Sequence, residues 1–120
     1  MLRTLFSLAA LSMLSAAIYA QDPLGLPAGL VNVDCQPQSK QVPIVMIHGT
    51  FASTRRAFSS LAPTLKADGH CLFALNYGRQ NAFSFYGTMD INKSAQQISE
   101  FVQSVLARTG AEKVTLIGHS

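Results

Sequence analysis

Three consecutive residues have the types and spacing of a nucleophile on a tight turn. Gly118, His119 and Ser120 directly follow the apolar run 114–117, which is typical of a buried strand. A serine hydroxyl becomes a useful nucleophile when a strand-to-helix turn lifts it above the sheet and a base removes its proton. We therefore interpret Ser120 as a nucleophile and expect glycine at 118 because a side chain there would clash across the turn. An ordinary serine after a strand is the alternative, since Gly-x-Ser alone is weakly specific.

A second segment of this kind, His48-Gly49-Thr50-Phe51, follows the first apolar run of the chain. Acyl transfer places negative charge on a carbonyl oxygen in the transition state, and positioned N–H groups stabilise that charge. One donor is the amide after the nucleophile, and the other comes from the loop after an earlier strand. We predict the Thr50 amide as this second donor and Phe51 as the next choice, with Gly49 allowing close backbone approach. A generic turn into the following helix is the alternative.

A base for Ser120 is harder to assign, although the sequence contains three histidines. His48 is expected to brace the oxyanion loop, His70 lies at the wrong end of the sheet, and His119 should point away from the serine. Enzymes with this turn have the order Ser, acid, His, so we expect the acid and base beyond residue 120 and little activity from residues 21–120 alone. A His48–Asp90–Ser120 arrangement in the chymotrypsin order is disfavoured because helices and strands alternate along the chain.

The elements that must position these residues alternate in type. The order strand, helix, strand, helix, strand predicts an α/β fold, a partial α/β-hydrolase-like domain with a three-stranded parallel sheet (βαβαβ) and flanking helices. If the strand order reverses at the first strand, Thr50 and Ser120 flank one crevice at the carboxyl ends. The predicted strands are residues 42–47, 71–75 and 113–117.

Two helices are predicted between these strands. The first starts at Ser53 or Thr54 and runs to about residue 68, and Pro63 is expected to kink or shorten it. The second ends at Gly110, and residues 94–97 fit a capping box near its start. Its candidate N-caps are Asp90, Asn92 and Ser94. Its apolar stripe consists of Ile91, Ala95, Ile98, Val102 and Val105.

Residues 76–90 form a predicted loop rich in aromatic side chains. Aromatics beyond the carboxyl end of a strand suit a wall for an acyl chain, and packing against another part of the protein is an equal alternative. The aromatic residues are Tyr77, Phe83, Phe85 and Tyr86. Asn92 begins a glycosylation sequon, to which we assign no role because chance matches are frequent.

The first twenty residues have the layout of a secretory signal peptide. Arg3 gives a positive start, residues 5–18 are apolar or small, and Ala20 ends a cleavage site. A membrane anchor is the alternative, although the apolar run is short for a span of about 20 residues. We therefore expect a secreted protein. The predicted divisions are a signal peptide (1–20), an irregular lead-in (21–41) and the start of the folded domain (42–120).

Composition limits the partners and suggests one covalent link. The net charge is +3 without a basic run, which gives little support to nucleic-acid binding. Cys35 and Cys71 are the two cysteines, and an even pair in an exported protein is a disulfide candidate. Two buried free thiols are the alternative. No residue pattern implies a metal or another cofactor.

These segments together resemble the secreted α/β-hydrolase lipases of the triacylglycerol lipase type over roughly residues 33–120. The resemblance implies a lipase or esterase with Ser120 as nucleophile, an oxyanion amide near Thr50 and a disulfide between Cys35 and Cys71. The sequence lacks the second glycine of the turn, the acid and the base, so it resembles the front part of such an enzyme. The resemblance is carried by Cys35, VPIVMIHGTF (42–51), Ala62-Pro63, HCLFALNYG (70–78) and AEKVTLIGHS (111–120).

The sequence therefore predicts a secreted carboxylic-ester hydrolase that acts on acylglycerols through an acyl-enzyme on Ser120. The expected partner is a lipid or ester substrate, with interfacial contact with lipid. An acyltransferase on the same scaffold and a non-catalytic lipid-binding protein are the alternatives. Four residues flank the proposed donor and nucleophile within the two motifs. They are His48 and Gly49 before Thr50, and Gly118 and His119 before Ser120.

Overall fold

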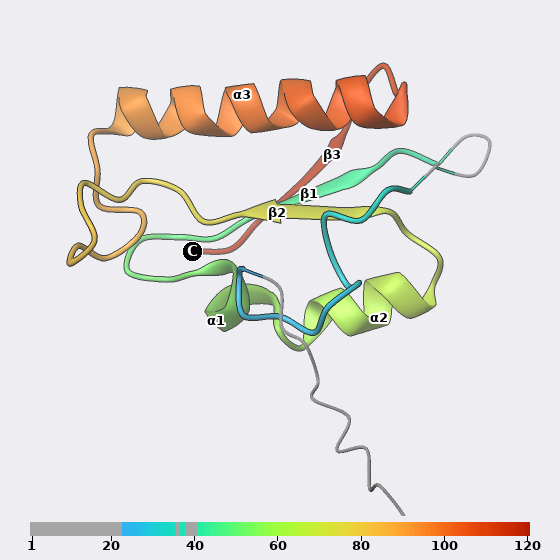
Figure 1. The fold of residues 1–120 in the computed structure, drawn as a ribbon, viewed down its shortest axis with the longest axis horizontal. Coiled ribbons are helices and arrows are strands. Elements are labelled where there is room, and N and C mark those ends of the chain that lie inside the picture. The colour runs from blue at the N-terminus through green and yellow to red at the C-terminus, as the bar shows by residue number, and fades with distance from the viewer. Residues whose placement is uncertain (1–22, 36, 38–40) are drawn as a thin grey trace, which may run out of the picture.

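The computed structural model describes residues 23–120, apart from residues 36 and 38–40. The predicted signal peptide lies outside the described residues. None of the described helices is long and apolar enough to cross a membrane. In chain order, the elements in Figure 1 are β1 (Ile44–Ile47), α1 (Thr54–Phe58), α2 (Leu61–Ala67), β2 (Leu72–Leu75), α3 (Ile91–Thr109) and β3 (Thr115–Gly118).

The strands form one parallel sheet in the order β2-β1-β3, which confirms the predicted α/β fold. Ile44 of β1 lies opposite Leu72 of β2 and opposite Thr115 of β3. Each strand begins one or two residues later than predicted. The strand order reverses at β1, so the carboxyl ends of β1 and β3 are neighbours. In parallel sheets, ligands bind in the crevice at such a reversal.

The sheet buries a separate apolar core on each face. Figure 1 shows α1 and α2 below the sheet and α3 above it. On the lower face, Met46 of β1 packs with Phe58 of α1 and Ala62 of α2. On the upper face, Val45 of β1 packs with Val105 of α3. Because both faces of β1 are covered, every position of this strand must be apolar, which explains the continuous apolar run in the sequence.

The single helix predicted from residue 53 to about 68 is wrong, because the structure has two helices there, α1 and α2. Ser53 caps α1, since its hydroxyl accepts a hydrogen bond from the Arg56 amide at 3.3 Å. Within a continuous helix, Pro63 would lack a donor and its ring would clash with the carbonyl four residues earlier. The chain instead breaks after Phe58 and restarts at Leu61. Pro63 then lies in the first turn of α2, where no donor is needed.

Helix α3 starts with an aspartate cap rather than with the predicted capping box. The Asp90 carboxylate accepts hydrogen bonds from the amides two and three residues later, at 3.0 and 3.1 Å. The capping box at residues 94–97 is wrong, because Ser94 is buried inside the helix. The side chain of Gln97 instead accepts a hydrogen bond from the Gly78 amide at 2.8 Å. The helix is thereby tied to the segment that follows β2.

The apolar stripe of α3 is buried only along the part that covers the sheet. Val105 is fully buried, and Phe101 and Val102 pack against the upper core. Ile91 and Ala95, nearer the start of the helix, are exposed. In Figure 1 this first part of α3 lies over the loop that joins β2 to α3, at the end of the sheet where the strands terminate.

The lead-in closes the free edge of β2. Its described residues are irregular, yet Leu26, Leu30 and Val31 are buried in the lower core. The side chain of Asn32 donates to the Ala74 carbonyl at 2.8 Å and accepts from the Ala74 amide at 2.9 Å. One side-chain amide thus takes the place of a neighbouring strand on this edge.

Cys35 and Cys71 form a disulfide, with their Cα atoms 5.7 Å apart. Cys71 is buried directly before β2, and its carbonyl accepts a hydrogen bond from the Ile44 amide at 2.9 Å. The bridge therefore fastens the lead-in to the sheet. The alternative of two free thiols does not hold in this structure.

We expect the Cys35→Ala/Cys71→Ala variant to lose about 3–4 kcal/mol of unfolding free energy, because the bridge restricts the unfolded chain between two residues 36 apart in sequence. Urea unfolding of the oxidised protein and of the variant measures the difference. The reduced wild type is the control and should unfold like the variant. Equal midpoints for all three proteins, or two reactive thiols in the non-reduced protein, would contradict the bridge.

Candidate active site

The loop after β1 and the end of β3 touch through their backbones. A Cβ atom added at Gly49 would lie 2.7 Å from the His119 carbonyl oxygen and 2.9 Å from the Ser120 Cα. Backbone atoms do not tolerate such approaches, so glycine is required at this position. The His119 amide donates to the Ile47 carbonyl at 3.0 Å, which extends the β1–β3 pairing to this point. The structure thus brings the predicted oxyanion loop against the predicted nucleophile.

Two further glycines support Gly49 from behind. A Cβ atom at Gly87 would lie 2.8 Å from the Gly49 carbonyl oxygen and 2.9 Å from the Thr50 Cα. A Cβ atom at Gly78 would lie 3.0 Å from the Gly87 Cα. Both glycines also have a φ of +71°, which disfavours other residues. Segments from three parts of the chain therefore stack without intervening side chains behind the oxyanion loop.

The two predicted oxyanion donors differ in whether their amides are free. The Phe51 amide donates to the Tyr86 carbonyl at 3.0 Å. In the described part of the chain, the Thr50 amide has no hydrogen-bond partner. Of the two amides, the Thr50 N–H is thus the one available to a ligand. Phe51 also has a φ of +58°, a strained value for a residue with a side chain, and the bond to Tyr86 helps to hold it.

Ser120 lies two residues after the end of β3 and is exposed. Gly118, the last residue of β3, was expected to be glycine for steric reasons. Among the described residues, a Cβ atom at Gly118 would meet no heavy atom within 4 Å. The described residues therefore give no steric reason for glycine at this position.

His48 is buried and bonded through both ring nitrogens. Its Nδ1 lies 2.9 Å from the Gly49 carbonyl oxygen, and its Nε2 accepts a hydrogen bond from the Tyr77 amide at 3.3 Å. A carbonyl needs a donor and an amide needs an acceptor, so this geometry assigns the neutral tautomer with its proton on Nδ1. Burial lowers the pKa of His48 below its ordinary value of 6.5, although the bond to Gly49 opposes this effect. His48 thus acts as a neutral brace.

Tyr77 is a site residue whose role the sequence analysis did not identify. Its ring stacks on the His48 ring with centroids 4.5 Å apart, and its hydroxyl donates to the His48 carbonyl at 2.6 Å. Burial raises the pKa of the Tyr77 phenol, which keeps it protonated as a donor. The available signal was its position two residues after β2, because β2 ends beside β1 in the sheet.

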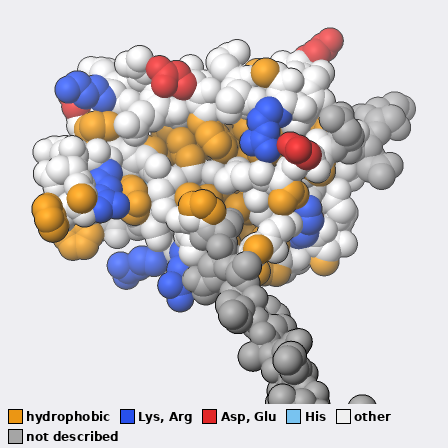
Figure 2. Space-filling model, in the orientation of Figure 1, with side chains coloured by type: hydrophobic (Ala, Val, Ile, Leu, Met, Phe, Trp, Pro, Cys, Tyr) orange, Lys and Arg blue, Asp and Glu red, His pale blue; other side chains and the backbone are white. Residues whose placement is uncertain are grey.

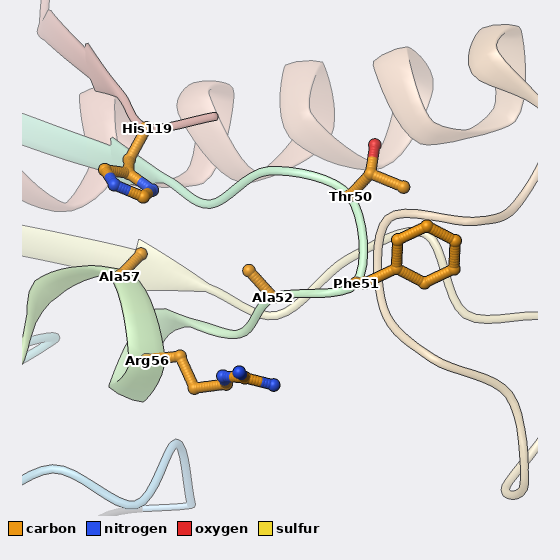
Figure 3. A pocket seen from close by; sticks show the side chains of 6 residues that line it. All are labelled: Thr50, Phe51, Ala52, Arg56, Ala57 and His119. Atoms are coloured by element: carbon orange, nitrogen blue, oxygen red, sulfur yellow. The ribbon is translucent and has the colours of Figure 1, made fainter.

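A cavity of about 390 Å³ opens beside His119, between the oxyanion loop and α1. Figure 3 shows His119 of the β3 end and Ala57 of α1 pointing toward one another, with Arg56 extending along the cavity below Ala52. The His119 ring also lies edge-on to Phe58, with centroids 6.3 Å apart. The His119 side chain therefore lies on the α1 face of the sheet. The residues that line the cavity are Thr50, Phe51, Ala52, Arg56, Ala57 and His119.

No described histidine is arranged as a base for Ser120. Both nitrogens of His48 are occupied, and the His119 ring lies against α1. His70 precedes β2, at the amino end of the sheet. The described residues also contain no cluster of three or more His, Cys, Asp or Glu side chains that could hold a metal ion. These residues thus supply a hydroxyl, one free amide and a cavity, but no proton acceptor.

Comparisons with known proteins identify the family. A family model described as Lipase (class 2) matches residues 41–120, a stretch that contains both the oxyanion loop and Ser120. The chain belongs to the class 2 lipase family. A triacylglycerol lipase of Vibrio cholerae serotype O1 is 32% identical to it over 117 residues. The match covers 94% of this chain and 33% of the relative, so the chain spans about a third of the length of the curated relative.

Family membership confirms the resemblance to lipases seen in the sequence. The family is described as one of lipases, which are enzymes that hydrolyse lipid esters. The candidate site agrees with this chemistry, because it holds a serine hydroxyl and a free amide on two segments in backbone contact, and acyl transfer requires both kinds of group.

Gly49→Ala should lower kcat for a soluble p-nitrophenyl ester about 100-fold, since the methyl group would push the oxyanion loop away from Ser120. The measurement uses protein expressed from the complete reading frame. Gly69→Ala is the control for a general loss of stability, because alanine is strained there by a φ of +87° but meets no neighbouring atom within 4 Å and lies before β2, at the opposite end of the sheet. Equal activity of Gly49→Ala and wild type would contradict the close contact.

The buried, neutral His48 should make the protein less stable as the pH falls. The pKa of His48 is lower in the folded than in the unfolded chain, so below about pH 6.5 the unfolded chain binds more protons. The stabilising contribution is complete above pH 6.5 and decreases as the pH falls through the folded pKa. Urea unfolding between pH 8 and pH 5 should give a shallower pH dependence for His48→Gln than for wild type. Equal slopes would contradict the neutral brace.

Proposed function

We propose that the protein is a secreted carboxylic-ester hydrolase acting on acylglycerols, with Ser120 as nucleophile and the Thr50 amide as one oxyanion donor. The observation that carries the proposal is the backbone contact of Gly49 with His119 and Ser120. It lets a carbonyl group bound at the Ser120 hydroxyl reach the free Thr50 amide. Secretion is supported by the pattern of residues 1–20 and by the disulfide.

In the proposed reaction, the Ser120 oxygen attacks the ester carbonyl carbon while a base removes the hydroxyl proton. The carbonyl oxygen becomes an oxyanion, which the Thr50 N–H stabilises together with a second amide after the serine. The tetrahedral intermediate collapses, and the alcohol leaves with the proton. Water then attacks the acyl-enzyme by the same route and releases the fatty acid. The protein ends each cycle unchanged.

We place the acid and base of this reaction beyond residue 120. The three histidines of the chain are a neutral brace, a residue at the opposite sheet end and a side chain on the α1 face, and none of them is free to accept the Ser120 proton. The order Ser, acid, His in enzymes with this turn supports the same conclusion. The residues described here would then supply the nucleophile and one donor.

The cavity beside His119 is the proposed binding site for the acyl chain. Its volume of about 390 Å³ lies in the usual range for ligand pockets. Ala52, Ala57 and Phe51 provide apolar contacts for a hydrocarbon chain, and His119, which lines the cavity, is the residue before the serine. Arg56 supplies a charged group along the cavity.

A fluorophosphonate probe should label protein expressed from the complete reading frame at Ser120, because such probes react with activated serine hydroxyls. Ser120→Ala should abolish labelling and lower kcat for a p-nitrophenyl ester at least 1000-fold. Ser59→Ala is the matched control, since it removes an exposed hydroxyl between α1 and α2 and should change neither result.

Other outcomes separate the proposal from its alternatives. A protein that binds lipid but is never labelled would be a non-catalytic lipid-binding protein. If an added alcohol acceptor receives most of the acyl groups in place of water, the protein is an acyltransferase on the same scaffold.

A further inference from the structure

Three phenylalanine side chains project into solvent next to the candidate active site. Phe83 is 99% exposed, Phe85 is 67% exposed and Phe51 is 62% exposed. The rings of Phe51 and Phe85 contact one another edge to face, with centroids 5.9 Å apart. Single exposed apolar residues are ordinary, but an aromatic cluster at one end of a protein marks an interaction surface.

The loop that carries Phe83 and Phe85 is held in shape by its own polar contacts. The Arg79 guanidinium donates to the carbonyls of Asn81 and Ala82 and to the Tyr86 hydroxyl. The Asn81 side chain accepts from the Phe83 amide at 2.9 Å. These bonds order the loop although the Phe83 ring has almost no contact with the rest of the described residues. The Phe83 ring is therefore exposed because the hydrogen-bonded loop holds it in solvent, and not because the loop lacks a defined conformation.

Two arginines beside the phenylalanines carry charge that no carboxylate balances. In the described part of the chain, the one ion pair joins Arg108 to Asp34. Arg56 and Arg79 therefore have no acidic partner there, and the nearest carboxylate along the loop, Asp90, caps α3. Figure 2 shows orange and blue side chains side by side at this left-hand end of the molecule.

The aromatic and charged residues are continuous with the acyl cavity. A groove of about 300 Å³ is lined by Phe51, Phe85, Arg56 and Arg79, among others. It shares Phe51, Ala52 and Arg56 with the cavity beside His119. A molecule seated on the phenylalanines would therefore lie at the entrance to the site.

We propose that Phe51, Phe83, Phe85, Arg56 and Arg79 form a docking surface for a bilayer that contains anionic phospholipid. Aromatic rings enter the interface between headgroups and acyl chains, while arginines attract the phosphates. The charge favours a lipid surface over a second copy of this basic chain, because two such patches would repel one another. This inference rests on the proposed function in one respect. The proposed ester hydrolysis is the reason to regard the cavity beside His119 as the place where a lipid taken from the bilayer binds.

The test is sedimentation with vesicles of phosphatidylcholine, with or without 30% phosphatidylglycerol, which is a composition we choose for the assay. The protein is expressed from its complete reading frame in the Ser120→Ala background, so that binding is measured without hydrolysis. Binding should be stronger with phosphatidylglycerol and should weaken at high salt. A failure of the proposed catalysis would leave this measurement intact.

Phe83→Ser/Phe85→Ser should weaken binding to both vesicles roughly 10-fold or more, because two exposed rings no longer enter the interface. Arg56→Gln should weaken binding to the anionic vesicles about fivefold and leave binding to neutral vesicles unchanged. Leu61→Ser on α2 is the control for an exposed apolar residue, and Lys113→Gln before β3 is the control for a lost positive charge. Neither control should change binding.

Three results would overturn the proposal. Equal binding of wild type and the double phenylalanine variant would show that another surface meets the lipid. A lower unfolding midpoint of that variant without lipid would show that the rings pack against another part of the polypeptide. A dimer that dissociates in the variant would show that the patch joins two copies of the chain.

Discussion

The contact between the backbone at Gly49 and the backbone at His119 and Ser120 is the constraint on which the candidate site depends. Neighbouring strands of a sheet lie only about 4.8 Å apart, so the chain leaving β1 and the end of β3 have no space for a side chain between them. Gly87 and Gly78 continue the same close packing behind the loop. Three glycines from separate segments therefore fix how near the free amide lies to the serine. A larger residue at any of them would separate the two groups that we propose act on one carbonyl.

Close packing alone would leave the loop free to change its turn, and buried polar contacts prevent this. His48 and Tyr77 form a stacked pair whose hydrogen bonds hold both the carbonyl of His48 and the carbonyl of Gly49. The Tyr86 carbonyl holds the Phe51 amide in a strained conformation, and this leaves the Thr50 amide as the unpaired donor of the turn. Donors that are fixed before the substrate arrives need no rearrangement when charge develops on the oxyanion. The strain at Phe51 is consistent with such a role, because strained residues persist where the surroundings determine their conformation.

The scaffold could be predicted from the sequence because β1 and β2 are buried on both faces and thus appear as apolar runs, and β3 has a similar run although most of its residues are exposed among the described residues. The proposed oxyanion loop and the proposed nucleophile were predicted from the residues after two of those runs. Local rules failed where tertiary contacts decide between alternatives. Pro63 indicated a disturbance, but only the packing of two short helices on the sheet determines where the second one starts. Asp90 and Ser94 are equally good caps in isolation, and the choice follows from Gln97 bonding to the segment after β2. The bracing role of Tyr77 depends on β2 lying beside β1, which spacing along the chain does not encode.

The two edges of the sheet differ in how they are covered. On the β2 edge, the Asn32 side chain occupies both the amide and the carbonyl of Ala74, so no strand can pair there. On the β3 edge, the described residues offer no such cover, and Leu116 is 56% exposed. Leu116 lies opposite Val45, so its exposed side chain marks a part of the upper face over β3 that no described helix covers, whereas parallel sheets normally have both faces covered. A strand added to this sheet would therefore pair beside β3. Its carboxyl end would lie next to that of β3, at the end of the sheet where Ser120 lies and where ligands bind in parallel sheets.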